Sequence, residues 1–68
     1  MKSISGKDFA KLLQKHGWNL KRINGSHHIL TKAGRRECIS VPVHGNQPLK
    51  IGLLRTLLKL TSIDESAL

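Results

Sequence analysis

Two apolar stripes with helical spacing enclose a segment with strand and turn signals, and this order limits the chain to a mixed α and β fold. The first stripe follows a helix start at Ser5 and ends at Gly17, which favours the left-handed conformation beyond a helix. Its members are Phe9, Leu12, Leu13 and His16. The second stripe consists of Ile51, Leu54, Leu57 and Leu58, widened by Leu53 and Leu60. Both segments are therefore predicted to form amphipathic helices.

A hairpin is predicted directly after the first helix. Asn24-Gly25 is a strong signal for a two-residue turn, and it follows a strand-like segment over residues 18–23. A turn at this position pairs Arg22 with His27 and Lys21 with His28. Since side chains alternate between the faces of a strand, the two histidines point to opposite faces. The expected core face holds Trp18, Leu20, Ile29 and, at its edge, His27, whereas the expected opposite face holds Asn19, Lys21, His28 and Leu30.

A second turn, with Gly34 in the left-handed conformation, joins the hairpin to a third strand near residues 37–43. We expect a three-residue loop, because a two-residue loop would turn Ile39 and Val41 away from the core. The resulting pairs are Ile29 with Ile39 and His27 with Val41. Residues 42–48, which include two prolines, are expected to form an irregular connection to the second helix.

The predicted fold class is therefore α+β in the order α-β-β-β-α, with two helices on one face of a three-stranded antiparallel sheet. This is the element order of the double-stranded-RNA-binding domain. Residues 1–68 are expected to form a single domain, because the chain shows no linker, repeat or low-complexity stretch. Residues 61–68 are expected to form either a short helical turn or a frayed tail.

The net charge is the clearest indication of a partner. The chain has twelve Lys and Arg residues against four acidic residues, a formal net charge of +8. Two acids lie near the C-terminus, so residues 1–60 carry twelve bases against Asp8 and Glu37, a difference of +10. This excess predicts a polyanionic partner, with nucleic acid as the first candidate and an acidic protein as the alternative. A membrane partner is not expected, because the bases do not lie along one amphipathic helix.

The composition argues against metal sites and cofactors. The single cysteine, Cys38, excludes an internal disulfide and a Cys-rich zinc site, and it is expected to be buried in a strand. Asp8 and Glu37 are too few to hold Mg²⁺, and the spacing of the four histidines matches no usual zinc site. A core this small leaves no room for a large cofactor. We therefore expect neither a metal nor a small-molecule cofactor.

A cytoplasmic location is expected. No apolar run approaches the roughly 18 residues that would span a bilayer. The first five residues lack the apolar segment that a secretory signal needs.

RNA cleavage is a reaction that these residues support without a metal. RNA carries its own nucleophile, the 2′-hydroxyl group, so the protein needs only to move protons and stabilise negative charge on the phosphate. Histidine suits the proton transfer because its unperturbed pKa, about 6.5, lies close to neutral pH. His27 is the first candidate, because the expected register places it beside Arg22. His28, beside Lys21, is the second, and His44 is expected to be a solvent-exposed loop residue.

The contacts to RNA are expected from polar and cationic residues around these histidines and on the second helix. They are Lys21, Arg22, Ser26, Lys50 and Arg55. Trp18 and Phe9, the only aromatic residues, are expected in the core. Recognition through phosphates, 2′-hydroxyl groups and shape is therefore favoured over base stacking.

Three segments stand out by their order and spacing: Gly25-Ser26-His27-His28-Ile29-Leu30, Ile39-Ser40-Val41-Pro42-Val43-His44-Gly45-Asn46 and Leu49-Lys50-Ile51-Gly52-Leu53-Leu54-Arg55. Together with Gly17-Trp18, they resemble the HicA family of toxins over residues 9–60. The resemblance implies the toxin of a type II toxin–antitoxin pair, with a double-stranded-RNA-binding-like fold. It further implies metal-independent cleavage of mRNA and neutralisation by a HicB-type antitoxin. The family's catalytic histidine follows Gly-Ser, which corresponds to His27, with Gly25 and Ser26 as the turn that presents it.

Three functional hypotheses follow. The first is a metal-independent endoribonuclease, an mRNA interferase, in which His27 acts as general base or general acid. The second is a non-catalytic RNA-binding module of the same fold. The third is a basic adaptor whose partner is an acidic protein.

Overall fold

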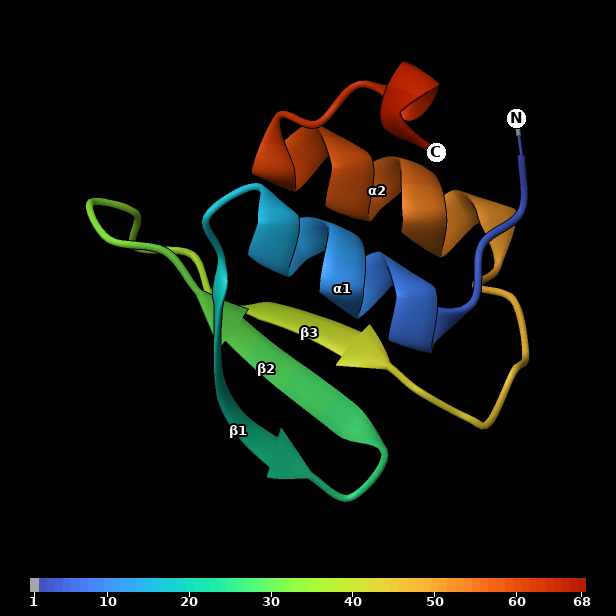
Figure 1. Cartoon of the computed structure of the whole chain (residues 1–68), viewed down its shortest axis with the longest axis horizontal. Coiled ribbons are helices and arrows are strands. Elements are labelled where there is room, and N and C mark those ends of the chain that lie inside the picture. Colours follow the sequence, from blue (N-terminus) through green and yellow to red (C-terminus); the bar gives the residue numbers. More distant parts are fainter. Residues whose placement is uncertain (1) are drawn as a thin grey trace.

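The structure is a computed structural model that describes residues 2–68. Its elements are α1 (Gly6–Lys15), β1 (Asn19–Asn24), β2 (His27–Thr31), β3 (Ile39–Pro42), α2 (Ile51–Thr61) and the short 3-10 helix η1 (Glu65–Ala67) (Figure 1). The three strands form one antiparallel sheet in the order β1-β2-β3. The predicted order α-β-β-β-α is therefore confirmed.

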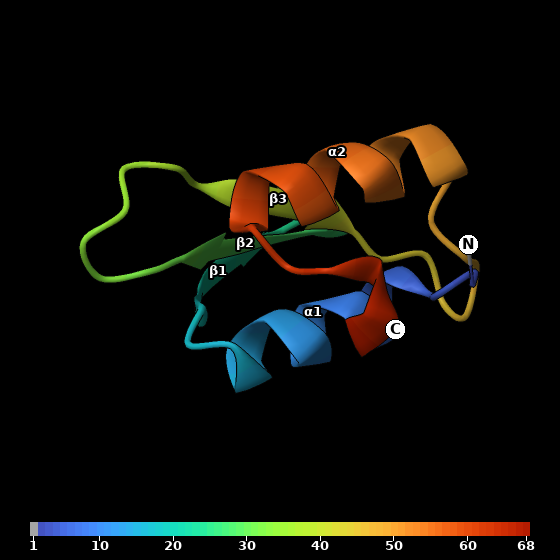
Figure 2. The ribbon, with the colours of Figure 1, turned by 90° about the horizontal axis from the view of Figure 1, so that it is seen from above.

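Both helices cover the same face of the sheet, as predicted, and lie side by side in the same direction (Figures 1 and 2). The core lies between the helices and the sheet. Its largest fully buried side chains are those of Phe9, Leu13, Trp18, Leu30, Ile39, Val41 and Leu54. The other face, here named the open face, has no helix over it. By the strand register it holds Asn19, Arg22, Asn24, His27, Ile29, Thr31, Ser40 and Pro42.

The start of α1 is held in place by its cap and by close contact with β3. Ser5 caps the helix as predicted, since its Oγ accepts a hydrogen bond from the Asp8 amide at 3.2 Å. The preceding residue, Ile4, accepts a hydrogen bond from the Leu49 amide at 2.8 Å. A Cβ atom at Gly6 would overlap the carbonyl oxygen of Pro42. The close approach of α1 to the end of β3 therefore requires glycine at position 6.

The buried sides of the two helices differ from the predicted stripes. In α1 the buried residues are Gly6, Phe9, Ala10 and Leu13, whereas His16 is the exposed C-cap. In α2 they are Leu54, Leu57, Leu58 and Thr61. Ile51 and Leu60 were predicted for this stripe but are 42% and 45% exposed. At 3.6 residues per turn, Leu60 lies well outside the arc that the four buried residues share, and Ile51 lies at its edge.

The connection between β2 and β3 is longer than the predicted three-residue loop. It contains a turn closed by a hydrogen bond of 3.0 Å from the Arg35 amide to the Lys32 carbonyl, with Gly34 at φ 79° as expected. However, β3 begins only at Ile39, which lies opposite Leu30. Cys38 therefore precedes the strand and is exposed, so the prediction of a buried cysteine is wrong.

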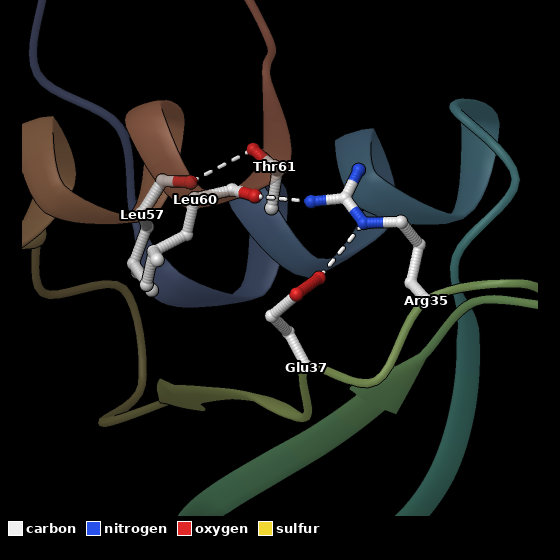
Figure 3. A network of polar contacts seen from close by, with 5 residues as sticks. All are labelled: Arg35, Glu37, Leu57, Leu60 and Thr61. Carbon is white, nitrogen blue, oxygen red and sulfur yellow. Dashed lines mark hydrogen bonds and ion pairs between the residues drawn. The ribbon is translucent and has the colours of Figure 1, made fainter.

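Arg35 ties this connection to the end of α2 (Figure 3). Its Nη2 donates to the Leu60 carbonyl at 2.7 Å, and its Nε donates to Glu37 Oε1 at 2.8 Å. The guanidinium carbon also lies 5.6 Å from the centroid of the Trp18 ring. The last carbonyls of a helix lack partners within it, so a cation here satisfies one of them and complements the helix dipole. The hydrogen bond from Arg35 lowers the pKa of the Glu37 carboxyl.

Replacing Arg35 by alanine is expected to lower the free energy of unfolding by about 1–2 kcal/mol, because two charge-assisted hydrogen bonds and a cation–π contact are lost. Urea unfolding followed by circular dichroism measures this change. Arg36→Ala is the matched control, since it removes the same charge from an exposed neighbour and should cost less than about 0.5 kcal/mol. Equal losses in both variants would contradict the role of Arg35.

The segment after α2 continues into an ordered turn. Thr61 ends the helix with a buried hydroxyl group that donates to the Leu57 carbonyl at 2.7 Å (Figure 3). Asp64 then caps η1 by accepting a hydrogen bond from the Ser66 amide at 2.8 Å, which lowers the pKa of Asp64. Leu68 packs against the core. Of the two alternatives for residues 61–68, the structure shows the short helical turn.

Candidate active site

The turn between β1 and β2 presents His27 as the first residue of β2. The turn residues are Gly25 and Ser26, and Asn24 lies opposite His27. Gly25 has φ 63°, and the first position of a type II′ turn requires such a positive φ. The predicted turn at Asn24-Gly25 is wrong by one residue. A type I′ turn there would need positive φ at Asn24 as well, whereas the observed turn needs it only at glycine.

A bulge in β1 accompanies this shift. Leu20 lies opposite Leu30, but Arg22 lies opposite Ile29, so Lys21 is the extra residue. Because of the bulge, Arg22 reaches the open face and Lys21 is exposed at the edge strand. The predicted pairing of Lys21 with His28 is therefore wrong.

The two adjacent histidines do point to opposite faces, but the predicted faces are exchanged. His27 is exposed on the open face, opposite Pro42 of β3. His28 lies opposite Val41, whose side chain is fully buried, so His28 faces the helices and is half-buried. The extra residue Lys21 in β1 shifts the pairing by one residue and so exchanges the two faces of β2 relative to the prediction, which is the reason for the error. His27 is consequently the histidine that a large ligand on the open face can reach.

Arg22 shares the open face with His27, although it does not pair with it as predicted. Its partner Ile29 lies two residues beyond His27 on β2, so Arg22 and His27 are diagonal neighbours. Diagonal neighbours lie about 7–8 Å apart, within reach of a long side chain. A phosphate that contacts the His27 imidazole is therefore within reach of the Arg22 guanidinium.

Ser26 holds the turn in place through its backbone. Its carbonyl accepts a hydrogen bond of 2.7 Å from the Val43 amide, directly after β3. The residue itself is half-buried. This bond fixes the hairpin turn, and with it His27, against the segment that follows β3.

A hollow of about 310 Å³ lies beside the end of β3. It is lined by Pro42, His44, Gln47, Pro48, Leu49, Lys50 and Leu53. Lys50 is the N-cap of α2 and is exposed. Because Pro42 lies opposite His27, the hollow adjoins the strand partner of the candidate catalytic residue. His44 is an exposed loop residue, as predicted, but the prediction of an irregular connection over residues 42–48 did not place it at a hollow.

The remaining predicted contact, Arg55, is not brought to His27. It is exposed on α2, in the helix layer, and the sheet separates it from the open face. The α1 lysines Lys7, Lys11 and Lys15 are likewise exposed. Positive charge therefore covers both layers of the molecule.

Two further observations concern metals and membranes. Across residues 2–68, no group of three or more His, Cys, Asp and Glu side chains lies close enough together to hold a metal ion. Nor does any helix within this range have the length and apolar character needed to cross a membrane. The titratable or charged side chains that the register places on the open face are the His27 imidazole and the Arg22 guanidinium.

The fold and the site define a small basic α+β domain with the element order of double-stranded-RNA-binding domains and an accessible histidine at a hairpin turn. The family described as the HicA toxin of bacterial toxin–antitoxin systems matches residues 6–63, which are 58 of the 68 residues. The chain therefore belongs to the HicA toxin family, and it is a toxin of a toxin–antitoxin system. No curated protein matches the chain.

Proposed function

We propose that this toxin is an mRNA interferase in which His27 transfers a proton during cleavage of the RNA backbone. The observation that carries the proposal is the position of His27, exposed on the open face and fixed by the Gly25–Ser26 turn. Arg22 on the same face supplies a positive charge for the phosphate. Membership of the HicA family supports the toxin role.

The reaction uses the nucleophile that RNA itself carries. The 2′-oxygen attacks the neighbouring phosphorus, and the bond from phosphorus to the 5′-oxygen of the next nucleotide breaks. The 2′-hydroxyl group loses a proton, the 5′-oxygen gains one, and the products are a 2′,3′-cyclic phosphate and a 5′-hydroxyl group. His27 performs one of these transfers as general base or general acid. Arg22 stabilises the additional negative charge on the phosphorane.

The substrate is held through its phosphates. Lys21 and Arg22 are exposed cations on the hairpin, Lys50 is an exposed cation that lines the hollow, and Arg55 extends the positive surface along α2. The net charge of +8 predicts affinity that falls steeply with salt concentration. We expect an mRNA strand to bind by its backbone, without aromatic stacking.

A HicB-type antitoxin is the proposed partner in the cytoplasm, in a type II pair. The open face has no helix over it, so a protein bound there would block access to His27 (Figure 1). Acidic residues on the antitoxin would complement the basic surface.

The test is RNA cleavage by the purified chain in EDTA, with two substrates. The first is mRNA, on which the cleavage site is mapped, and the second is an oligoribonucleotide that carries one 2′-deoxynucleotide at that site. We expect cleavage to persist in EDTA, to leave a 2′,3′-cyclic phosphate, and to stop at the deoxy position while binding is retained. Cleavage that needs an added divalent cation, or that continues at the deoxy position, would contradict the mechanism. Salt-dependent binding without any cleavage would favour the RNA-binding module, and weak binding even at low salt would favour the adaptor.

A further inference from the structure

We propose that His44 is a second catalytic residue, which performs the proton transfer that His27 does not. This inference rests on the proposed function and adds to it the assignment of the second proton. It follows from the backbone pairing around β3 and from the hollow that His44 and Lys50 line.

The backbone places His44 next to the hairpin turn. Pro42 lies opposite His27, and the hydrogen bond of 2.7 Å from Val43 to Ser26 extends this pairing one residue beyond β3. His44 follows directly. Because Pro42 and His44 both line the hollow, His44 lies on the side of Pro42, close to the position diagonal to His27.

The position of His44 is fixed on both sides. Before it, Val43 is bonded to the turn, and after it the Gln47 amide donates to the His44 carbonyl at 3.1 Å. Gly45, at φ 58°, allows the tight turn between these two bonds. The His44 side chain is exposed and lines the hollow. It is therefore a histidine held near the turn, and its imidazole remains accessible to a ligand.

The chemistry requires two proton transfers in different places. In an in-line displacement the attacking 2′-oxygen and the departing 5′-oxygen lie on opposite sides of the phosphorus, so one imidazole cannot contact both at once. Diagonal neighbours about 7–8 Å apart leave room for a phosphate between their rings. His27 and His44 thus have the arrangement that paired general base and general acid catalysis needs.

Lys50 completes this arrangement. It lines the same hollow as His44 and Pro42, and no acidic residue is among the lining residues. Its ammonium group can therefore approach a phosphate between the two histidines. A cation in this position stabilises the charge that develops on the phosphorane.

The test compares His27→Ala and His44→Ala on two substrates, natural RNA and RNA whose 5′-bridging oxygen at the cleavage site is replaced by sulfur. We expect each variant to cleave natural RNA at least about 100-fold more slowly than the wild type. A thiolate leaves without being protonated, so the variant that lacks the general acid should recover a rate close to wild type on the sulfur substrate. The other variant should remain slow, and the comparison therefore also assigns the acid and the base.

His16→Ala is the matched control, because His16 is another exposed histidine and lies at the C-terminal end of α1. This variant should cleave both substrates at the wild-type rate. Melting curves check that each variant folds. If His44→Ala does not fold, His44→Gln replaces it. If the His44 variants cleave natural RNA at the wild-type rate, the pairing is overturned. It is also overturned if both alanine variants remain slow on the sulfur substrate. A wild-type protein that cleaves no RNA would instead remove the proposed function, and the pairing with it.

Discussion

His27→Ala is expected to reduce the rate of RNA cleavage by about 10²–10⁴-fold and to abolish growth arrest on expression. The side chain is exposed on the open face, so its removal leaves no cavity and should change the free energy of unfolding by less than about 0.5 kcal/mol. Single-turnover rate constants, growth curves and melting curves measure the three effects. The large loss of activity at unchanged stability is the signature of a residue that contacts the substrate.

His28→Ala is the informative comparison, because His28 is adjacent in sequence but faces the helices. We expect it to lower the free energy of unfolding by about 1 kcal/mol through lost packing, with a cleavage rate close to wild type for the folded fraction. The opposite result, in which His28→Ala loses cleavage and His27→Ala retains it, would refute the assignment of His27.

The second large effect is expected at Gly6. Gly6→Ala should destabilise the protein by about 3 kcal/mol, the upper end for overpacking, because the added Cβ meets the backbone carbonyl of Pro42. At roughly 0.05–0.15 kcal/mol per residue, a chain of this length has a stability of about 3–10 kcal/mol, so the loss is a large part of the total. Chemical unfolding measures it.

Gly52→Ala is the control for helix propensity. Gly52 also lies in the first turn of a helix, but a Cβ built there meets nothing within 4 Å. We expect this variant to be more stable by about 0.5–1 kcal/mol, since alanine favours a helix over glycine. The two glycine variants should therefore change stability in opposite directions, and a stabilising Gly6→Ala would show that α1 does not approach β3 as described.

Local patterns were sufficient to predict the order of the elements. The helix stripes, the cap at Ser5 and the turn glycines each depend on a few neighbouring residues, and the structure confirms α-β-β-β-α on that basis. Phe9, Leu13 and Leu54 were also placed correctly in the core. For His27, by contrast, the expected register gave only a weak preference over His28, and the resemblance to a family motif strengthened it.

The register of the sheet was beyond the reach of local patterns. Two turns are compatible with Asn24-Gly25-Ser26, and a one-residue bulge in the strand before them exchanges the faces of the whole following strand. The bulge at Lys21 and the burial of Leu30 against the helices decide which face of β2 is covered. The tertiary structure therefore determines that His27, and not His28, lies on the open face.

The sequence by itself thus determined the fold class, the basic charge and the hairpin that carries the candidate histidine. Only the tertiary structure decided the face on which His27 lies, the hollow that joins His44 to Lys50, and the need for glycine at position 6. The physical reason is the range of the interactions. Periodicity, capping and turn preference act over a few residues, whereas register and close backbone approach depend on contacts between segments far apart in the chain.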